Sequence, residues 1–265
     1  MNTIMLFRES WPIGFCIMSA CLGGILGSFL GVVSERVPAM VMEKEGAGNL
    51  LFPASHCADC GHQLAWWENI PLLSWCGLRG RCRHCQSVIP LRLLLVELAS
   101  ALFFAATAAA LPSSVTLIAL WVLWCGLLPL TMIDAKYMLL PDCLTQPLLW
   151  AGLLLHCVFH TMPLASVLYG AVAGYLILWL VYWSFRLLTG REGLGQGDFK
   201  LLAALGAWCG WQALPLLILV AALIGIVLYG LFYSGVNKAG QIPFGPCLAF
   251  SGMAMFIFQT LQFTF

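Results

Sequence analysis

The stretch Gly193-Leu194-Gly195-Gln196-Gly197-Asp198-Phe199-Lys200 places a carboxylate among glycines, where one long apolar run ends and another begins. A charged side chain beside hydrocarbon is costly, so an acid in this position indicates a functional site. A second acid, Asp134, stands at the end of an earlier apolar run, 64 residues before Asp198. Two carboxylates in comparable positions predict acid–base chemistry that is shared by a pair.

The composition around this stretch is that of an integral membrane protein. The chain has 265 residues, of which 62% are hydrophobic and only 9% are charged, whereas soluble domains carry about 25% charged residues. The formal net charge of +1 predicts no polyanionic partner, and therefore no nucleic acid.

The apolar runs predict an all-α, polytopic helical bundle with about eight transmembrane helices. They cover residues 13–33, 93–111, 115–133, 143–160, 165–188, 199–210, 212–234 and 244–263. The run 199–210 is short for a full span, so the count is eight with it and seven without it. The expected domains are a first transmembrane helix in 1–33, a polar loop domain in 34–92 and a helical membrane domain in 93–265.

The distribution of basic residues predicts the orientation. With eight spans and the N-terminus outside, eleven of the twelve Lys and Arg residues face the cytoplasm and only Arg8 lies outside. Asp134 and Asp198 are then both expected at the cytoplasmic face. A seven-span count would move Lys238 to the other side but leave both acids inside.

The two acids suit the chemistry of an aspartic protease. Two nearby carboxylates cannot both ionise easily, so one stays protonated near neutral pH. The charged one can take a proton from water, while the protonated one supports the scissile carbonyl and then the leaving amine. The alternative is that Asp134 and Asp198 only cap helices at the interface. The glycines also resemble a nucleotide-binding loop, but such a loop follows a β-strand, and the residues before Gly193 are predicted to form a membrane helix.

Other polar residues near the membrane have structural interpretations. Asp142 is predicted to cap the helix that follows it. Glu97, near Arg92, is predicted to be an interfacial charge that snorkels or pairs. His156 and His160 are predicted to face lipid headgroups or neighbouring helices.

Four cysteines in the polar loop have the spacing of a metal site. Cys57, Cys60, Cys82 and Cys85 form a C-x2-C-x21-C-x2-C pattern, and four thiolates suit a structural Zn²⁺ with no open position for water. Two disulfides are the alternative, which a reducing cytoplasm disfavours, and a redox C-x-x-C is another. Three arginines just before and within the second pair indicate contact with anionic membrane lipid or with an acidic substrate segment. They are Arg79, Arg81 and Arg83.

The chain closely resembles the type IV prepilin peptidases (prepilin leader peptidase/N-methyltransferases), which are membrane aspartic proteases of the GxGD type. The matching motifs extend over nearly the whole length. They are Gly27-Ser28-Phe29-Leu30, the two C-x-x-C pairs around Trp66-Trp67-Glu68-Asn69-Ile70-Pro71, Leu78-Arg79-Gly80-Arg81-Cys82, Leu95-Val96-Glu97, Ile133-Asp134, Leu140-Pro141-Asp142, Gly195-Gln196-Gly197-Asp198-Phe199-Lys200 and Ile242-Pro243-Phe244-Gly245-Pro246. Gly31 and Glu35 depart from the residues that are usual in the family.

The resemblance implies a bifunctional enzyme of the bacterial inner membrane. Such enzymes cut the short basic leader from prepilins or pseudopilins of type IV pili and type II secretion, on the cytoplasmic side. They then methylate the new N-terminal amine with S-adenosylmethionine. The family's catalytic aspartates correspond to Asp134 and Asp198, and 93–265 becomes the peptidase domain. The partners are the leader and apolar helix of the substrate; a homo-oligomer is left open.

Two other classes of protein share some of these features. A proton-coupled transporter could use two acids as a relay, but that class usually shows internal repeats, and none is found. A membrane thiol–quinone oxidoreductase could use the C-x-x-C pairs, but it would place them on the oxidising side, opposite to the side that the basic residues predict.

Overall fold

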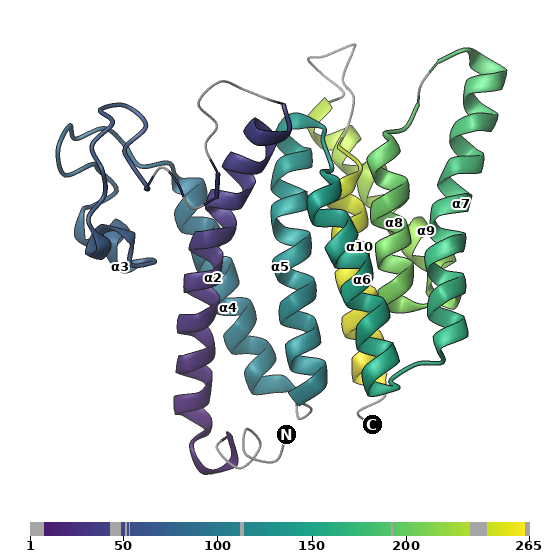
Figure 1. Cartoon of the computed structure of the whole chain (residues 1–265), viewed down its shortest axis with the longest axis horizontal. Helices are drawn as coiled ribbons and strands as arrows, with labels where there is room; N and C mark the ends of the chain where they lie inside the picture. Colours follow the sequence, from purple (N-terminus) through teal and green to yellow (C-terminus); the bar gives the residue numbers. More distant parts are fainter. Residues whose placement is uncertain are drawn as a thin grey trace. The chain divides into compact units, whose positions relative to one another are not determined.

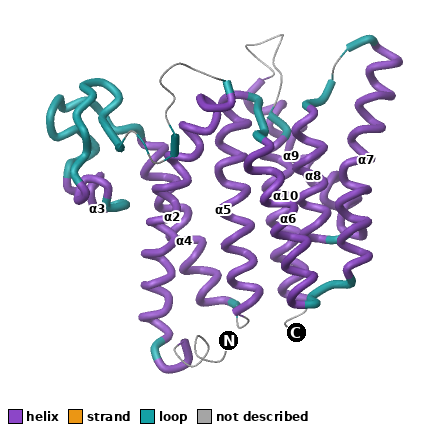
Figure 2. The backbone as a smooth tube through the Cα atoms, in the orientation of Figure 1, coloured by secondary structure: helices purple, strands orange, loops and turns teal. Residues whose placement is uncertain are grey.

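The computed structural model describes residues 8–42, 49, 50, 52, 54–111, 114–191, 193–233 and 243–262, and in these residues the fold is helical with no strand (Figure 2). Isolated bridges join His56 to Gln63 and Arg81 to Val88. The chain divides into two compact units, Met1–Trp121 and Val122–Phe265. The all-α prediction is therefore confirmed for the described residues.

Two long helices form the core of the first unit. Helix α2 (Pro12–Val41) and helix α4 (Leu91–Ala110) lie side by side along their lengths (Figure 1). A Cβ atom on Gly23 would lie 2.5 Å from the carbonyl oxygen of Ser100, and one on Gly27 would lie 2.9 Å from the Ser100 side chain. The glycines of α2 therefore allow close helix packing.

Helix α2 is longer than the apolar run that predicts it. The run ends at residue 33, whereas the helix continues to Val41 and includes Pro38. Apolar composition follows the thickness of the hydrocarbon layer, and the backbone can keep its helical hydrogen bonds beyond that layer. Glu35, in this extension, pairs with Arg92 of α4 at 2.6 Å.

The polar loop between α2 and α4 contains a 3₁₀ turn (Trp66–Asn69) and the short helix α3 (Leu73–Gly77). Glu97 of α4 holds this loop, because its Oε2 accepts a hydrogen bond of 2.8 Å from the Leu72 N–H. The Glu97 carboxylate thus has a partner, as one of its two predicted interpretations requires, but the partner is a backbone N–H and not a basic side chain. Arg92 pairs with Glu35 instead.

The second unit contains most of the remaining helices, and α5 begins in the first unit and continues into it. The helices are α5 (Ser114–Tyr137), α6 (Asp142–Phe159), α7 (Leu164–Thr189), α8 (Gln196–Cys209), α9 (Leu214–Leu228) and α10 (Gly245–Gln262). Helix α8 packs against α6, α7 and α10 (Figure 1). A 3₁₀ turn (Trp211–Ala213) precedes α9 and a π-helical segment (Tyr229–Tyr233) follows it.

The contact between α7 and α8 depends on glycine. A Cβ atom on Gly174 of α7 would lie 2.6 Å from the carbonyl oxygen of Leu202, and one on Gly170 would overlap the backbone of Gly206. Small residues let two helix backbones approach closely. This approach buries α8 almost completely, and even its Trp208 is only 1% exposed.

Each of the eight predicted apolar runs forms a helix, but the count of eight spans is not confirmed. Six described segments are long and apolar enough to cross a membrane: α2, α4, α5, α6, α7 and Trp211–Leu231. Helix α8 has only 14 residues, and α10 is also outside this group. Lys238 and Ile242, used in the predicted orientation and motifs, lie outside the described residues.

Candidate active site and metal centre

Asp134 lies in the last turn of α5, facing the start of α10. Its side chain is 5% exposed, and its Oδ2 accepts a hydrogen bond of 2.9 Å from the Gly245 N–H. A carboxylate at the C-terminal end of a helix opposes the helix dipole. The position therefore costs stability, which is typical of residues retained for function.

Asp198 lies in the first turn of α8, where the helix dipole favours an acid. It is 6% exposed. Its carboxylate lies against Gly195, where an added Cβ atom would be 3.3 Å from Oδ2. Because Gly195 has no side chain, its own backbone can approach this carboxylate closely and donate a hydrogen bond to it.

The fold brings the two acids together, because the charge of Asp134 acts on Asp198. The Cys247 thiol of α10 lies close enough to both carboxylates, Asp134 and Asp198, to interact with their charges. Neither acid occupies an N-cap: Gly195 precedes α8, and Asp134 lies at the far end of its helix. Asp134 therefore does not cap its helix, whereas the Asp198 carboxylate, at the third position of α8, accepts a hydrogen bond from the backbone of Gly195 and so also contributes to the start of its helix. Two buried carboxylates whose charges interact titrate as a pair, and such a pair can supply one acid and one base.

Asp142 does not cap α6, contrary to the prediction. The N-cap is Pro141, and Asp142 is the first residue of the helix. Its two carboxylate oxygens accept hydrogen bonds of 2.6 and 2.8 Å from the Lys200 ammonium of α8. An acid at this helix end is still favoured by the dipole, but its contacts reach another helix.

His156 contacts neighbouring structure, one of its two predicted environments. It is 3% exposed. Its Nε2 lies 3.0 Å from the carbonyl oxygen of Trp208, and its Nδ1 lies 2.6 Å from the Thr161 hydroxyl. Both ring nitrogens therefore have partners, which is the arrangement expected of a buried structural histidine.

The four predicted metal-ligating cysteines come together in the first unit. The Sγ atoms of Cys57, Cys60, Cys82 and Cys85 all lie within 4.8 Å of one another, and those of Cys57 and Cys85 are 3.7 Å apart. All four cysteines are free thiols, so the disulfide alternative is not found. Four sulfur atoms bound to zinc at about 2.3 Å in a tetrahedron are about 3.8 Å apart. The cluster therefore fits a metal ion of this kind.

The two halves of the cluster have the same backbone structure. In the first, the Gly61 N–H donates to the Cys57 carbonyl oxygen at 3.0 Å. In the second, the Gln86 N–H donates to the Cys82 carbonyl oxygen at 3.0 Å. Gly61 and Gln86 both have positive φ angles, 69° and 60°. Each C-x-x-C pair is thus followed directly by a left-handed residue, which turns the chain back so that both thiols of the pair face the same point.

The Ser87 hydroxyl adds a polar partner for two of these thiols. It lies 3.0 Å from the Cys85 Sγ and 3.5 Å from the Cys57 Sγ. Hydrogen bonds from Ser87, and then from the backbone of Cys60 and Asp59, lower the pKa of the Cys57 thiol to about 6. The Ser87 hydroxyl also lowers the pKa of Cys85. Thiolates are the form that binds metal, so these contacts favour metal binding.

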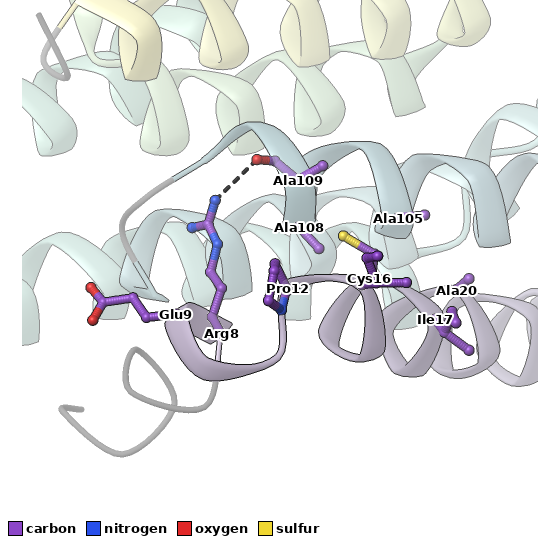
Figure 3. A pocket seen from close by; sticks show the side chains of 10 residues that line it. Arg8, Glu9, Pro12, Cys16, Ile17, Ala20, Ala105, Ala108 and Ala109 are labelled. Carbon is purple, nitrogen blue, oxygen red and sulfur yellow. Dashed lines mark hydrogen bonds between the residues drawn. The ribbon is translucent and has the colours of Figure 1, made fainter.

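A groove of about 800 Å³ lies between the N-terminal part of α2 and the end of α4. Ala105, Ala108 and Ala109 form its α4 side, and Arg8 at one end donates a hydrogen bond of 3.0 Å to the Ala109 carbonyl oxygen (Figure 3). Its lining is mostly apolar and belongs to the first unit alone. It contains neither of the two buried aspartates.

Three features of the sites were not predicted from the sequence. They are the Gly245 N–H that binds Asp134, the ion pair of Lys200 with Asp142, and the Ser87 hydroxyl beside the thiols. The motifs that contain Gly245 and Lys200 are visible in the sequence, but nothing in their spacing shows which residues they contact. Lys200 and Asp142 are 58 positions apart in the sequence, and Gly245 and Asp134 are 111 positions apart. Contacts over such separations arise only when the helices pack together.

Comparisons with known proteins agree with this arrangement. Residues 21–111 match the bacterial peptidase A24 N-terminal domain, and residues 121–230 match the type IV leader peptidase family. A relative from Stutzerimonas stutzeri, named prepilin leader peptidase/N-methyltransferase, is 46% identical over 265 residues, covering 93% of this chain and 91% of the relative. Proteins with the same name are 44% identical in Pseudomonas aeruginosa (93% of this chain, 91% of the relative) and 48% identical in Aeromonas hydrophila (86% and 85%).

No solved structure matches the chain. The similarity to the named relatives extends over almost the whole sequence, and the two matched domains together include the cysteine cluster and both buried aspartates. The chain therefore belongs to the type IV leader peptidase family of integral membrane enzymes.

Proposed function

We propose that this enzyme removes the leader peptide from type IV prepilins or pseudopilins and methylates the new N-terminal amine, with Asp134 and Asp198 as the catalytic pair. The observation that carries the assignment of the pair is that two buried carboxylates from different helices lie close enough for their charges to interact, one of them held by the Gly245 N–H. The two activities rest on the family.

In this proposal the two acids have complementary tasks. The ionised carboxylate takes a proton from water, which attacks the scissile carbonyl carbon. The protonated carboxylate donates a hydrogen bond to the carbonyl oxygen and later supplies a proton to the leaving amine. The Gly245 N–H keeps the Asp134 carboxylate in one orientation.

The substrate, co-substrate and location are proposed from the family and the charge distribution. The substrate's apolar helix lies among the spans in the inner membrane and presents its cytoplasmic end to the two acids. S-adenosylmethionine is the methyl donor. The basic residues favour a cytoplasmic active site, and membrane lipid surrounds the spans. No nucleic-acid partner is proposed, and a homo-oligomer is left open.

The cysteine cluster is proposed to bind one structural Zn²⁺ through Cys57, Cys60, Cys82 and Cys85. The Sγ separations and the paired left-handed turns support this assignment. When bound, the ion supplies cross-links that a small polar loop needs, because such a loop cannot build a sufficient core.

Cys82→Ser is expected to remove the zinc from the purified protein, which should otherwise contain about one zinc per chain. Cys82 is the buried member of the cluster. Zinc would be measured by elemental mass spectrometry, and trypsin would test whether the loop around Arg81 and Arg83 becomes easier to cut. Cys76→Ser is the control, because Cys76 is an exposed thiol outside the cluster. Equal zinc in both variants would contradict the assignment.

The proposed function is tested with membranes that contain the full chain, a candidate prepilin and S-adenosylmethionine. Mass spectrometry of the product is expected to show loss of the leader and a mature chain that is heavier by one methyl group. A cleaved but unmethylated product would refute the second activity in this chain. A related enzyme from another species serves as the positive control on the same prepilin. If that enzyme cuts the prepilin and this one does not, the proposed leader-peptidase activity is refuted.

A further inference from the structure

We propose that Asp142 and Lys200 are positioning residues that hold Asp134 and Asp198 at their working separation. This inference rests on the proposed function, because it assumes that the two buried aspartates carry out the cleavage. Asp142 and Lys200 are not placed in contact with the substrate; they act on the reaction through the helices that carry the two acids.

The ion pair joins the start of α6 to the first turns of α8. The Lys200 Nζ lies 2.6 Å from Oδ1 and 2.8 Å from Oδ2 of Asp142, so it binds both oxygens of the carboxylate. Lys200 follows Asp198 by two residues. A movement of Lys200 toward or away from α6 therefore carries the backbone of Asp198 with it.

The other end of the ion pair is connected to Asp134 by a short segment. Only seven residues separate Asp134 from Asp142. At the end of α5, the Met138 N–H donates a hydrogen bond of 2.9 Å to the Asp134 carbonyl oxygen. Met138 then adopts a left-handed conformation with φ of 53°, which turns the chain toward α6. The position of Asp142 is thus tied to the end of the helix that carries Asp134.

A second contact joins the same two segments on the other side of Asp198. Leu140 packs so closely on Gly197 that a Cβ atom added there would lie 2.7 Å from the Leu140 Cβ. Gly197 and Lys200 flank Asp198, and both meet the segment that follows Asp134. Two contacts restrict the relative movement of two elements more than one, so the Leu140 contact and the ion pair together define the separation of the acids.

The solvent exposure of the Asp142–Lys200 ion pair indicates that it positions the two aspartates rather than stabilises the whole fold. The side chains of Lys200 and Asp142 are 33% and 60% exposed, and exposed ion pairs contribute little to global stability. Catalysis is far more sensitive to geometry, since a misplacement of about 1 Å can cost about 100-fold in rate. Loss of the pair should therefore lower the rate constant without unfolding the enzyme.

The test is a double-mutant cycle in the full-length enzyme, with kcat and KM measured for cleavage of a prepilin. Asp142→Asn and Lys200→Gln are each expected to lower kcat by about 30- to 100-fold with KM changed by less than about threefold. The double variant should lose no more than the single variants, because both changes break the same interaction. Lys200→Arg can still bind both carboxylate oxygens and should keep most of the activity.

The pH profile of cleavage gives a readout that a purely structural role would not change. The apparent pKa values of two coupled carboxylates depend on their separation. The width of the bell-shaped profile is therefore expected to change in Asp142→Asn and Lys200→Gln. Fewer folded molecules would lower the whole profile without changing its shape. The thermal unfolding temperature in detergent should stay close to that of the wild type.

The control is Arg92→Gln, which breaks another exposed ion pair between two helices, at 2.6 Å from Glu35. Cleavage should be unchanged in this variant. Additive losses in the double variant, or an unchanged pH profile, would overturn the positioning role. Failure of the proposed function is separately visible, because Asp134→Asn in the same series would then still cut the substrate.

Discussion

Asp134→Asn and Asp198→Asn are each expected to lower the rate of prepilin cleavage by about 1,000-fold or more. Asparagine has nearly the same shape as aspartate but can neither accept a proton from water nor supply one to the leaving amine. General acid–base catalysis by one positioned group contributes about 10²- to 10⁴-fold, and in the proposed mechanism each of the two acids has such a task. Each single change should therefore cost almost as much as both changes together.

The measurement is single-turnover cleavage of a prepilin by purified enzyme in lipid nanodiscs, resolved by mass spectrometry. Glu9→Gln is the control for loss of a carboxylate, because Glu9 is an exposed acid of the first unit. Size-exclusion elution and the thermal unfolding temperature show whether each variant is folded. Cleavage at the wild-type rate by either folded Asp variant would exclude the aspartic mechanism.

Gly245→Ala is expected to lower cleavage by about 100-fold, although the change adds only one methyl group. The new Cβ atom would lie 2.6 Å from Oδ2 and 3.0 Å from Cγ of Asp134, which is too close for either atom. The Asp134 carboxylate must then turn away, and it loses the hydrogen bond from the Gly245 N–H. The substrate and the fold remain, but one member of the acid pair points in the wrong direction.

Gly225→Ala in α9 is the matched control, since its Cβ atom would meet only the Cys247 Sγ, at 3.9 Å. That distance is an ordinary contact, and alanine is a better helix former than glycine. We expect wild-type activity from this variant. The affected parameter in Gly245→Ala should be kcat rather than KM. If both variants cut equally well, the orientation of Asp134 by Gly245 has no part in the reaction.

Much of the fold follows from apolar composition alone, because a helix is the simplest structure that satisfies its backbone in lipid. Every predicted run forms a helix, and the ends of α6 and α7 lie close to their predicted positions. Composition predicts the ends less well where a helix leaves the hydrocarbon. Helix α5 continues to Tyr137 beyond the predicted end at 133, so Asp134 lies within a helix.

The candidate sites could be predicted as residues but not as contacts. Asp134 and Asp198 are recognisable because an acid beside an apolar run is rare, and the four cysteines because their spacing is regular. The Asp142 side chain was expected to bind its own helix end, but Lys200 offers an opposite charge across the gap between α6 and α8. The helix-capping preference used for Asp142 considers only the residues of one helix and therefore cannot predict a contact with a neighbouring helix.

The short length of α8 has a consequence for the biosynthesis of the enzyme. Its 14 residues extend about 21 Å, less than the hydrocarbon thickness of about 30 Å. A segment of this length gains too little from lipid to insert stably by itself, and it depends on its neighbours α6, α7 and α10. Helix α10 is made after α8, and it also provides the Gly245 N–H for Asp134. In the proposed mechanism a nascent chain therefore carries both aspartates before Gly245 can orient Asp134, and we expect proteolytic competence only after α10 has been made.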